Sequence, residues 1–296
     1  MTTYNYVIDG GIMKICVVGL GLIGGSMALA LRRAGYFVAG KNRSRAAIEY
    51  ALCHGAIDDE AEDVSLYDVV FVALPPRATV EYIAAEKFKK DAIVSDICGV
   101  KRYIEREVYS RRPDIRYIGT HPMAGKEVSG IENACADLFD RASMVLTKGE
   151  RTDESAYEAI KKIIKDIGFK RLVECSAEVH DKKIAYTSQL AHIVSNCYVK
   201  NPQIEGCLGF TGGSFQDMTR IAGVDENMWT ELYLNNADNL CGDIDLLAEK
   251  LGEISAAVRS RDKNALEALL HDGRVQFESG KNNSFQGEDV KTTLLK

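Results

Sequence analysis

The chain has 296 residues, of which 46% are hydrophobic and 27% charged, and its formal net charge is −6. This length suits two domains of ordinary size, and the composition is that of a globular protein. A net acidic chain is a poor match for nucleic acid, which binds to basic surfaces. No apolar run is long enough to cross a membrane, and the first residues lack the pattern of a secretory signal.

Eight cysteines are spread along the chain without a CxxC pair or a close Cys–His spacing. In a chain of this length the pattern is typical of reduced, mostly buried thiols, so we expect a cytoplasmic protein. The same spacing gives no reason to expect a metal site.

The first half of the chain alternates β-rich runs with helical runs. We expect strands at 15–18, 37–40, 69–74, 92–96, 116–119 and 143–146, and helices between them, for example at 26–34, 44–55 and 79–87. The run from Val69 to Leu74 is continuously apolar, which indicates a strand buried on both faces. Strands and helices alternating in this way predict a doubly wound, Rossmann-like α/β sheet.

The pattern changes near residue 175, after which we expect an all-helical domain. Ser176 has the position of an N-cap for a helix to about residue 200, and Asp225 that of a cap for a later long helix. A last helix is expected at 263–277. Within the long helix, apolar residues recur every three or four positions, at Leu240, Ile244, Leu247, Leu251, Ile254 and Val258. Such a seam either packs on the chain's own helices or joins two copies as a homodimer.

A glycine-rich turn, Gly19-Leu-Gly21-Leu22-Ile23-Gly24, follows the first expected strand and opens a helix. This order of strand, GxGxxG turn and helix is that of a dinucleotide-binding site. Gly19 allows the tight turn, Gly21 lets the backbone approach the pyrophosphate, and Gly24 lets helix and strand pack closely. The free N–H groups at the helix start, at Leu22 and Ile23, then face the phosphates.

The end of the second strand bears on which nicotinamide cofactor is used. NAD enzymes usually place a carboxylate there for the ribose 2′-hydroxyl, whereas this chain has Asn42, Arg43 and Ser44. Arg43 can hold a 2′-phosphate, and Ser44 can donate a hydrogen bond to it. We therefore expect NADP to be preferred over NAD, unless Arg43 is only a solvated surface cation and both cofactors are accepted.

Other strand ends carry further candidates. Leu74 and Pro75 end one strand and Cys98 follows another. Because ligands of a doubly wound sheet bind at the carboxyl ends of its strands, we expect all three to line the cofactor site. His121 follows a strand at the same edge. A dehydrogenase must accept a hydroxyl proton as hydride leaves the same carbon, and an imidazole with a near-neutral pKa suits that task.

Two further motifs make the chain resemble the prephenate and arogenate dehydrogenases of tyrosine biosynthesis. One is the run from His121 to Gly130, and the other is Gly212-Gly-Ser-Phe-Gln-Asp-Met-Thr-Arg220, followed by Met228-Trp229. With the glycine-rich turn, the resemblance covers about residues 14–258. It implies an oxidative decarboxylation in which His121 accepts a hydrogen bond from the C4 hydroxyl, hydride passes from C4 to the nicotinamide, and the ring carboxylate leaves as CO₂.

The resemblance also implies which residues contact the substrate. Arg220 corresponds to an arginine that binds a substrate carboxylate, and His192 to a histidine of the same pocket. Glu127 corresponds to an acidic residue at the pocket mouth. Asp217 corresponds to a residue that orients pocket side chains, also across a dimer interface.

Two positions depart from the family's pattern. Gly99 stands where many members have a serine, so a hydroxyl that would assist His121 is missing, and a water or Ser95 must take its place. Gln189 stands where many members have a histidine. We expect Gln189, like Gly213, to contact the substrate.

Three alternatives stay open on the sequence alone. Arogenate can be the substrate instead of prephenate, and the segment from Asn42 to Ser44 fits the NADP-dependent arogenate enzymes somewhat better. A two-domain hydroxy-acid dehydrogenase would use a lysine on the first helix after the sheet, where Lys182 and Lys183 lie. A cofactor-sensing module without turnover is the third.

These predictions divide the chain into segments. We assign residues 13–174 to a dinucleotide-binding Rossmann domain, 175–280 to a helical domain for substrate binding and dimerisation, and 1–12 and 281–296 to flexible termini.

Overall fold

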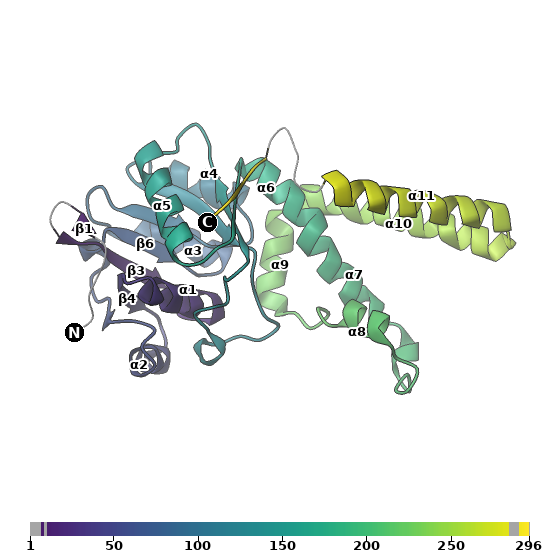
Figure 1. Ribbon diagram of the computed structural model, residues 1–296, viewed down its shortest axis with the longest axis horizontal. Helices are drawn as coiled ribbons and strands as arrows, with labels where there is room; N and C mark the ends of the chain where they lie inside the picture. Colours follow the sequence, from purple (N-terminus) through teal and green to yellow (C-terminus); the bar gives the residue numbers. More distant parts are fainter. Residues whose placement is uncertain (1–6, 9–10, 284–289, 296) are drawn as a thin grey trace.

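The computed structural model describes residues 7–8, 11–283 and 290–295 (Figure 1). Its larger sheet has the strand order β11-β10-β9-β8-β7-β6-β3-β4-β5. Six neighbouring strands are parallel: β5 (Asp59–Glu60), β4 (Phe37–Lys41), β3 (Lys14–Val18), β6 (Val69–Val72), β7 (Ile93–Asp96) and β8 (Arg116–Pro122). This order places two βαβ halves around β3, as in doubly wound dinucleotide-binding sheets. The predicted fold class is confirmed.

Helices cover both faces of this sheet, namely α1 (Leu22–Arg33), α2 (Arg45–Cys53), α3 (Pro76–Ala85), α4 (Arg102–Arg111) and α5 (Glu154–Asp166). Strand β3 shows why both faces must be covered, because its successive side chains point to opposite faces of the sheet and are apolar on both. Ile15 and Val17 belong to the core that includes α1, α2 and α5, whereas Cys16 and Val18 belong to the core that includes α3 and α4. The central strand is therefore apolar on both sides, as the sequence predicted for such strands.

Three strands extend the sheet beyond β8. They are β9 (Ser143–Thr147), antiparallel to β8, β10 (Arg171–Cys175), parallel to β9, and β11 (Lys291–Leu294), antiparallel to β10. Neither β10 nor β11 was predicted. The prediction of a flexible 281–296 is wrong for β11, because this segment pairs with the open backbone edge of β10 and Leu295 packs against the core.

The terminal predictions otherwise fall partly outside the described residues. In 1–12, β1 (Val7–Ile8) pairs with β2 (Gly11–Ile12), and residues 1–6 and 9–10 are not described. In 281–296, the last helix continues to Asn283, while 284–289 and 296 are not described.

The helical half begins directly after β10. It comprises α6 (Ala177–Ile184), the π-helical turn η3 (Ala185–Gln189), α7 (Leu190–Tyr198), α8 (Gly213–Thr219), α9 (Glu226–Asn235), α10 (Ala237–Ser260) and α11 (Lys263–Asn283), besides the short 3-10 turn η4 (Pro202–Ile204). Two more such turns, η1 (Val64–Leu66) and η2 (Ile131–Asn133), lie in the first half. Both predicted N-caps are confirmed, since Ser176 accepts the N–H of Val179 and Asp225 that of Met228.

The long helix expected after Asp225 is broken at Asn236, which separates α9 from α10. The side-chain amide of Asn236 donates hydrogen bonds to the carbonyl of Asp181 and to Oε1 of Gln189, both at 2.8 Å. These contacts hold the junction against α6 and η3, so that α10 can turn away and form an extended hairpin with α11 (Figure 1).

The apolar seam of α10 divides into two parts. Leu240 is 3% exposed and packs with Ala185 and Leu190, and Ile244 and Leu247 are partly buried beside them. By contrast, Leu251, Ile254 and Val258 are 59%, 38% and 56% exposed. The first part therefore packs on the chain's own helices, whereas the second part lies uncovered on the hairpin. Among the described helices, none is long and apolar enough to span a membrane.

Candidate functional site

The glycine-rich turn joins β3 to α1 as the sequence predicted. Gly19 has φ = 92°, and a Cβ there would lie 2.4 Å from the carbonyl oxygen of Ala73. A Cβ on Gly24 would lie 1.9 Å from the carbonyl oxygen of Gly19. Backbone packing thus requires glycine at both positions. A Cβ on Gly21 would meet nothing within 4 Å, so this part of the turn is open to a ligand.

The start of α1 has the properties of an anion site. Gly21 is the N-cap, no side chain caps the helix, and its first turn, which begins with Leu22 and Ile23, has no acidic residue. The N–H groups there and the helix dipole consequently favour a negative group in front of Gly21. This geometry fits the pyrophosphate of a nicotinamide dinucleotide.

The end of β4 lies beside the turn. Oδ1 of Asn42 accepts the N–H of Leu20 at 3.1 Å, so the Asn42 side chain holds the turn at Leu20. Ser44 is the N-cap of α2 and accepts the N–H of Ala47, which leaves its hydroxyl hydrogen available for another acceptor. Arg43 is exposed.

The other predicted cofactor residues meet at the same edge of the sheet. The Cδ2 atom of Leu74 lies 2.9 Å from the position that a Cβ on Gly19 would take, and Pro75 is the N-cap of α3. The Cys98 thiol donates to the carbonyl of Leu74 at 3.1 Å. Burial raises the pKa of this thiol well above its usual value, so it stays protonated. The thiol therefore serves to pack the loop rather than to react.

His121 lies at the end of β8, one strand beyond Cys98. Pairing of His121 with Val145 of β9 extends the strand past its predicted end at residue 119. Nδ1 of His121 lies 2.9 Å from Nε2 of His180, and Nδ1 of His180 lies 2.7 Å from Oδ1 of Asp181. Burial lowers the pKa of both imidazoles, and the nearby charge of Lys101 lowers the pKa of His121 further. Both rings are consequently neutral at pH 7.

A buried ion pair lies behind these histidines. Nζ of Lys101 contacts Oδ2 of Asp96, the hydroxyl of Tyr117 donates to Oδ1 of the same carboxylate, and both charged side chains are 0% exposed. The backbone N–H of Lys101 also donates to Asp181. The loop between β7 and α4 is thereby fixed to both β8 and α6.

The helical half supplies its groups from α7, α8 and α9. Nη1 of Arg220 forms an ion pair with Oε1 of Glu127, which joins the end of α8 to the loop after β8. The ring of His192 packs on that of Trp229 with centroids 3.9 Å apart, and its Nδ1 donates to the carbonyl of Ile221 at 3.0 Å. Burial lowers the pKa of His192, and the charge of Arg220 lowers it further. The hydrogen bond to Ile221 and the charge of Glu127 raise it in part. The hydrogen bond to Ile221, the residue after Arg220, places His192 beside the end of α8.

Helix α9 closes this site against the sheet. A Cβ on Gly99 would lie 3.3 Å from Cδ2 of Leu232 and 3.8 Å from both Cε1 and Nε2 of His121. One turn earlier on the same helix lies Trp229, which contacts His192. The side chain of Glu231 accepts the N–H of Arg77 at the start of α3. The His121 side and the Arg220 side of the predicted site therefore share α9 as one wall.

Some predicted residues have other roles. Gln189 is fully buried, and both ends of its amide are engaged, with the carbonyl of Leu232 and with Asn236. This corrects the expected substrate contact, since Gln189 instead joins η3 to α9 and α10. Ser95 is also fully buried, and its hydroxyl bonds to Thr120 rather than to His121. The expected replacement of the missing hydroxyl by Ser95 is therefore wrong.

The remaining candidates are exposed. Asp217 and Gly213 lie on the surface of α8, so their predicted roles stay predictions. Lys182 and Lys183 point to solvent from α6, which argues against the hydroxy-acid dehydrogenase alternative. Their neighbours His180 and Asp181 are the residues that the sequence reasoning missed. The adjacent His-Asp pair in the first helix after the sheet was the available signal.

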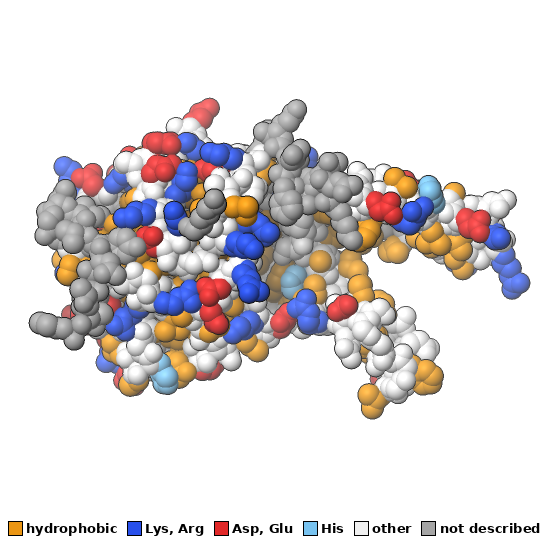
Figure 2. Space-filling model, viewed as in Figure 1, with side chains coloured by type: hydrophobic (Ala, Val, Ile, Leu, Met, Phe, Trp, Pro, Cys, Tyr) orange, Lys and Arg blue, Asp and Glu red, His pale blue; other side chains and the backbone are white. Residues whose placement is uncertain are grey.

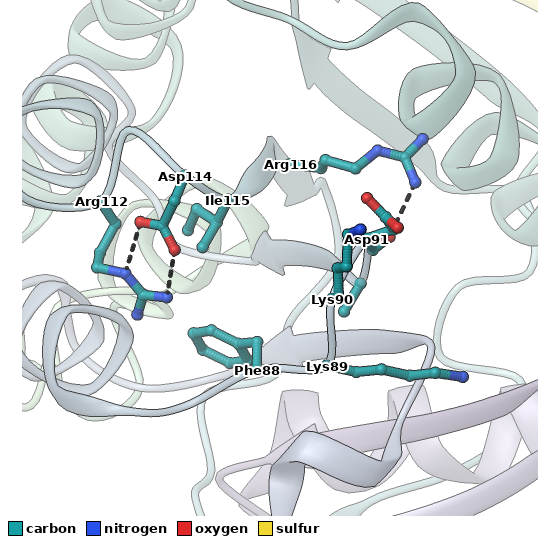
Figure 3. A pocket seen from close by; sticks show the side chains of 9 residues that line it. Phe88, Lys89, Lys90, Asp91, Arg112, Asp114, Ile115 and Arg116 are labelled. Atoms are coloured by element: carbon teal, nitrogen blue, oxygen red, sulfur yellow. Dashed lines mark hydrogen bonds and ion pairs between the residues drawn. The ribbon is translucent and has the colours of Figure 1, made fainter.

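A cavity lies away from this site (Figure 3). It has a volume of about 300 Å³ and lies before β7 and β8, at the amino ends of the strands. Three of its cations are engaged within the protein, Lys89 with Asp68, Arg112 with Asp114 and Arg116 with the carbonyl of Asp91. Within the described part of the chain, no three His, Cys, Asp or Glu side chains are grouped as metal ligands.

Comparison with known proteins gives the family. The model of the prephenate dehydrogenase nucleotide-binding domain matches residues 27–173, and the model of the prephenate dehydrogenase dimerization domain matches residues 176–272. The chain belongs to the prephenate dehydrogenase family. It is accordingly an NAD(P)-dependent oxidoreductase, and the family resemblance noted in its motifs is confirmed.

Individual relatives agree with this assignment. The chain is 32% identical to prephenate dehydrogenase of Bacillus subtilis (strain 168) over 270 residues, which cover 85% of this chain and 72% of the relative. It is similar to a crystal structure of prephenate dehydrogenase from A. aeolicus in complex with hydroxyphenyl propionate and NAD⁺, with a TM-score of 0.79 and 27% identity over 92% of this chain and 99% of the other. The crystal structure of Synechocystis arogenate dehydrogenase matches with a TM-score of 0.74 and 27% identity over 90% and 99% of the two chains.

Proposed function

We propose that this protein catalyses the NAD(P)⁺-dependent oxidative decarboxylation of prephenate to 4-hydroxyphenylpyruvate in tyrosine biosynthesis. One observation carries the proposal. The end of β8 carries the neutral imidazole of His121, and the loop that follows carries Glu127, the ion-pair partner of Arg220, at the same edge of the parallel sheet as the open glycine-rich turn. A base and a carboxylate-binding cation are thus brought together next to a dinucleotide site, as this reaction requires.

The residues of the site have separate roles in this reaction. Nε2 of His121 accepts a hydrogen bond from the C4 hydroxyl and holds its proton while the carbon is oxidised. Arg220 binds a substrate carboxylate, for which it exchanges its contact with Glu127. His192 and Trp229 form the adjoining wall and limit the access of water. The bound cofactor supplies the hydride acceptor.

The proposal assigns each part of the chain a task. Residues 13–174 hold the dinucleotide and His121, and residues 175–280 hold Arg220 and His192 and join two copies. The exposed apolar residues Leu251, Ile254 and Val258 fit a homodimer through α10 and α11, which the match to a dimerization domain supports. We expect the enzyme to work in the cytoplasm.

The cofactor preference is the finer part of the proposal. We infer that NADP is preferred over NAD, because β4 is followed by Asn42 instead of a carboxylate and by the exposed Arg43. Among the described residues Arg43 forms no ion pair, whereas Arg45 pairs with Glu49 and Glu60. The same segment, with the similarity to an arogenate dehydrogenase, makes arogenate the alternative substrate.

Steady-state kinetics with prephenate and arogenate, each with NAD⁺ and NADP⁺, test the proposal. The expected result is the highest kcat/KM for prephenate with NADP⁺, and a fall of roughly 10²- to 10⁴-fold in kcat for His121→Asn with unchanged cofactor affinity. A higher kcat/KM for arogenate would support the alternative. Near-normal turnover by His121→Asn, or no turnover of either substrate, would contradict the proposed chemistry.

A further inference from the structure

We propose that His180 is a positioning residue that fixes the tautomer of His121, and that Asp181 fixes the tautomer of His180. The inference rests on the proposed role of His121 as the acceptor of the C4 hydroxyl proton. It concerns a series of hydrogen bonds that runs from Asp181 through His180 to His121. The substrate contacts only the far end of this series, Nε2 of His121.

The series of contacts begins at the side chain of Asp181, whose oxygens accept hydrogen bonds. Oδ1 of Asp181 accepts the backbone N–H of Lys101 at 2.8 Å, and Oδ2 accepts that of Arg102 at 2.9 Å, so the start of α4 holds both oxygens in place as acceptors. Asp181 is 0% exposed, so its side chain does not reach the protein surface. The nitrogen that faces it, Nδ1 of His180 at 2.7 Å, must therefore carry a hydrogen.

The second step transfers this constraint to His121. Because His180 is 2% exposed and neutral, a hydrogen on its Nδ1 leaves a lone pair on its Nε2. Nδ1 of His121, 2.9 Å away, must then donate to that lone pair and carries the hydrogen of its own neutral ring. The remaining nitrogen of His121, Nε2, is left as a hydrogen-bond acceptor.

The acceptor nitrogen faces the proposed substrate site. Nε2 of His121 is 3.8 Å from the position of a Cβ on Gly99, in the loop that follows Cys98. Because residue 99 is glycine, it offers no side chain that could hydrogen-bond to Nε2 and select the tautomer from that side. The selection falls to His180, on the opposite side of the ring.

The contact also crosses from one half of the molecule to the other. His121 belongs to the nucleotide-binding sheet, whereas His180 and Asp181 belong to α6, the first helix of the helical half. The other charged groups that face the pair are Lys101 and Asp96, which are ion-paired with each other. His121 therefore acquires its accepting tautomer only when α6 is packed against α4 and the sheet.

Selective ¹⁵N labelling of histidine and NMR of the cofactor-free full chain give a direct readout of the tautomers. In the unmodified protein we expect His121 to carry its hydrogen on Nδ1. His180→Phe keeps a ring but removes both nitrogens, so His121 should become a mixture of tautomers and kcat should fall roughly 10- to 100-fold, with little change in the KM for the cofactor. His180→Gln restores a carbonyl acceptor and should recover part of the loss.

His54→Gln changes a surface histidine that stacks on Tyr50, and it should leave both the His121 tautomer and kcat unchanged. A hydrogen on Nε2 of His121 in the unmodified protein, or an unchanged kcat in His180→Phe and His180→Gln, would overturn the proposal. If His180→Phe fails to fold, judged by circular dichroism, the kcat of His180→Gln and the tautomer of the unmodified protein decide. Failure of the proposed function is seen separately, as normal turnover by His121→Asn, because the tautomer readout needs no substrate.

Discussion

His121 has to be neutral in order to accept a proton, and its surroundings secure this without a hydroxyl neighbour. Burial, aided by the nearby charge of Lys101, lowers its pKa well below the usual 6.5. A group whose pKa is lowered keeps its unprotonated form to a lower pH. The acidic limb of kcat/KM, which reports the free enzyme, should therefore lie below pH 6.5. A pH–rate profile with prephenate measures it, and a limb at or above pH 6.5 would show that the ring is not shielded in this way.

Arg43 and Arg45 offer a matched pair for testing cofactor choice. Both are exposed and two residues apart, but Arg45 is engaged with Glu49 and Glu60. Loss of a charge-assisted contact to a 2′-phosphate costs about 1.5–3 kcal/mol, so Arg43→Ala should raise the KM for NADP⁺ by roughly ten- to a hundredfold. The KM for NAD⁺ should stay the same, and Arg45→Ala should change neither. Equal effects of Arg43→Ala on both cofactors would contradict the preference for NADP.

The residues of the site were predictable from the sequence where a local pattern determines their place. The glycine turn and His121 follow apolar strands, and parallel strands bring their carboxyl ends to one edge. The partners of these residues were not predictable in the same way. The contact between His121 and His180 joins positions 59 apart in the chain, and no local pattern records that Gln189 turns inward to Asn236.

The turn between β3 and α1 shows how packing and ligand binding can be separated within one element. A Cβ on Gly24 would collide with the backbone of Gly19, whereas one on Gly21 would meet nothing. Gly24→Ala should therefore lower the free energy of unfolding by at least about 1–3 kcal/mol, measured by chemical denaturation. Gly21→Ala should leave stability unchanged and raise the KM of the cofactor, because its methyl group takes up space in front of the helix. Normal cofactor affinity in Gly21→Ala would argue against a pyrophosphate at this point.

Helix boundaries were predictable at their starts and unpredictable where tertiary contacts break a helix. Ser176 and Asp225 cap their helices through contacts three residues away, which sequence patterns record. The break at Asn236 depends on contacts with Asp181 and Gln189, which are 55 and 47 residues away. Likewise, β11 forms because β10 presents an open edge, a property of the assembled sheet.

The whole molecule has two prongs, the α10–α11 hairpin and the end formed by α7 and α8, with a hollow between them (Figures 1 and 2). Apolar side chains are exposed along the hairpin (Figure 2). A lone chain would keep this surface in contact with water, which is unfavourable by about 25 cal/mol for each Å². The shape and the exposed surface both favour a second copy of the chain as the partner that covers the hairpin.

Sedimentation equilibrium tests this arrangement. The unmodified protein should sediment as a dimer, and the pair of changes Leu251→Glu and Ile254→Glu should shift it to the mass of one chain by placing charges in the apolar surface. Lys250→Glu reverses a charge on the same helix without entering the apolar surface, so it should remain dimeric. A monomeric unmodified protein, or a double variant that stays dimeric, would contradict a dimer through this hairpin.

The central claim is that His121 and Arg220 act on one small carboxylate substrate, prephenate, beside the dinucleotide. A crystal structure with cofactor and 4-hydroxyphenylpyruvate tests it most directly. The account predicts the ring hydroxyl within hydrogen-bond distance of Nε2 of His121, and the carboxylate of the side chain on Arg220 in place of Glu127. Product bound elsewhere, or bound there with either residue turned away from it, would contradict the account.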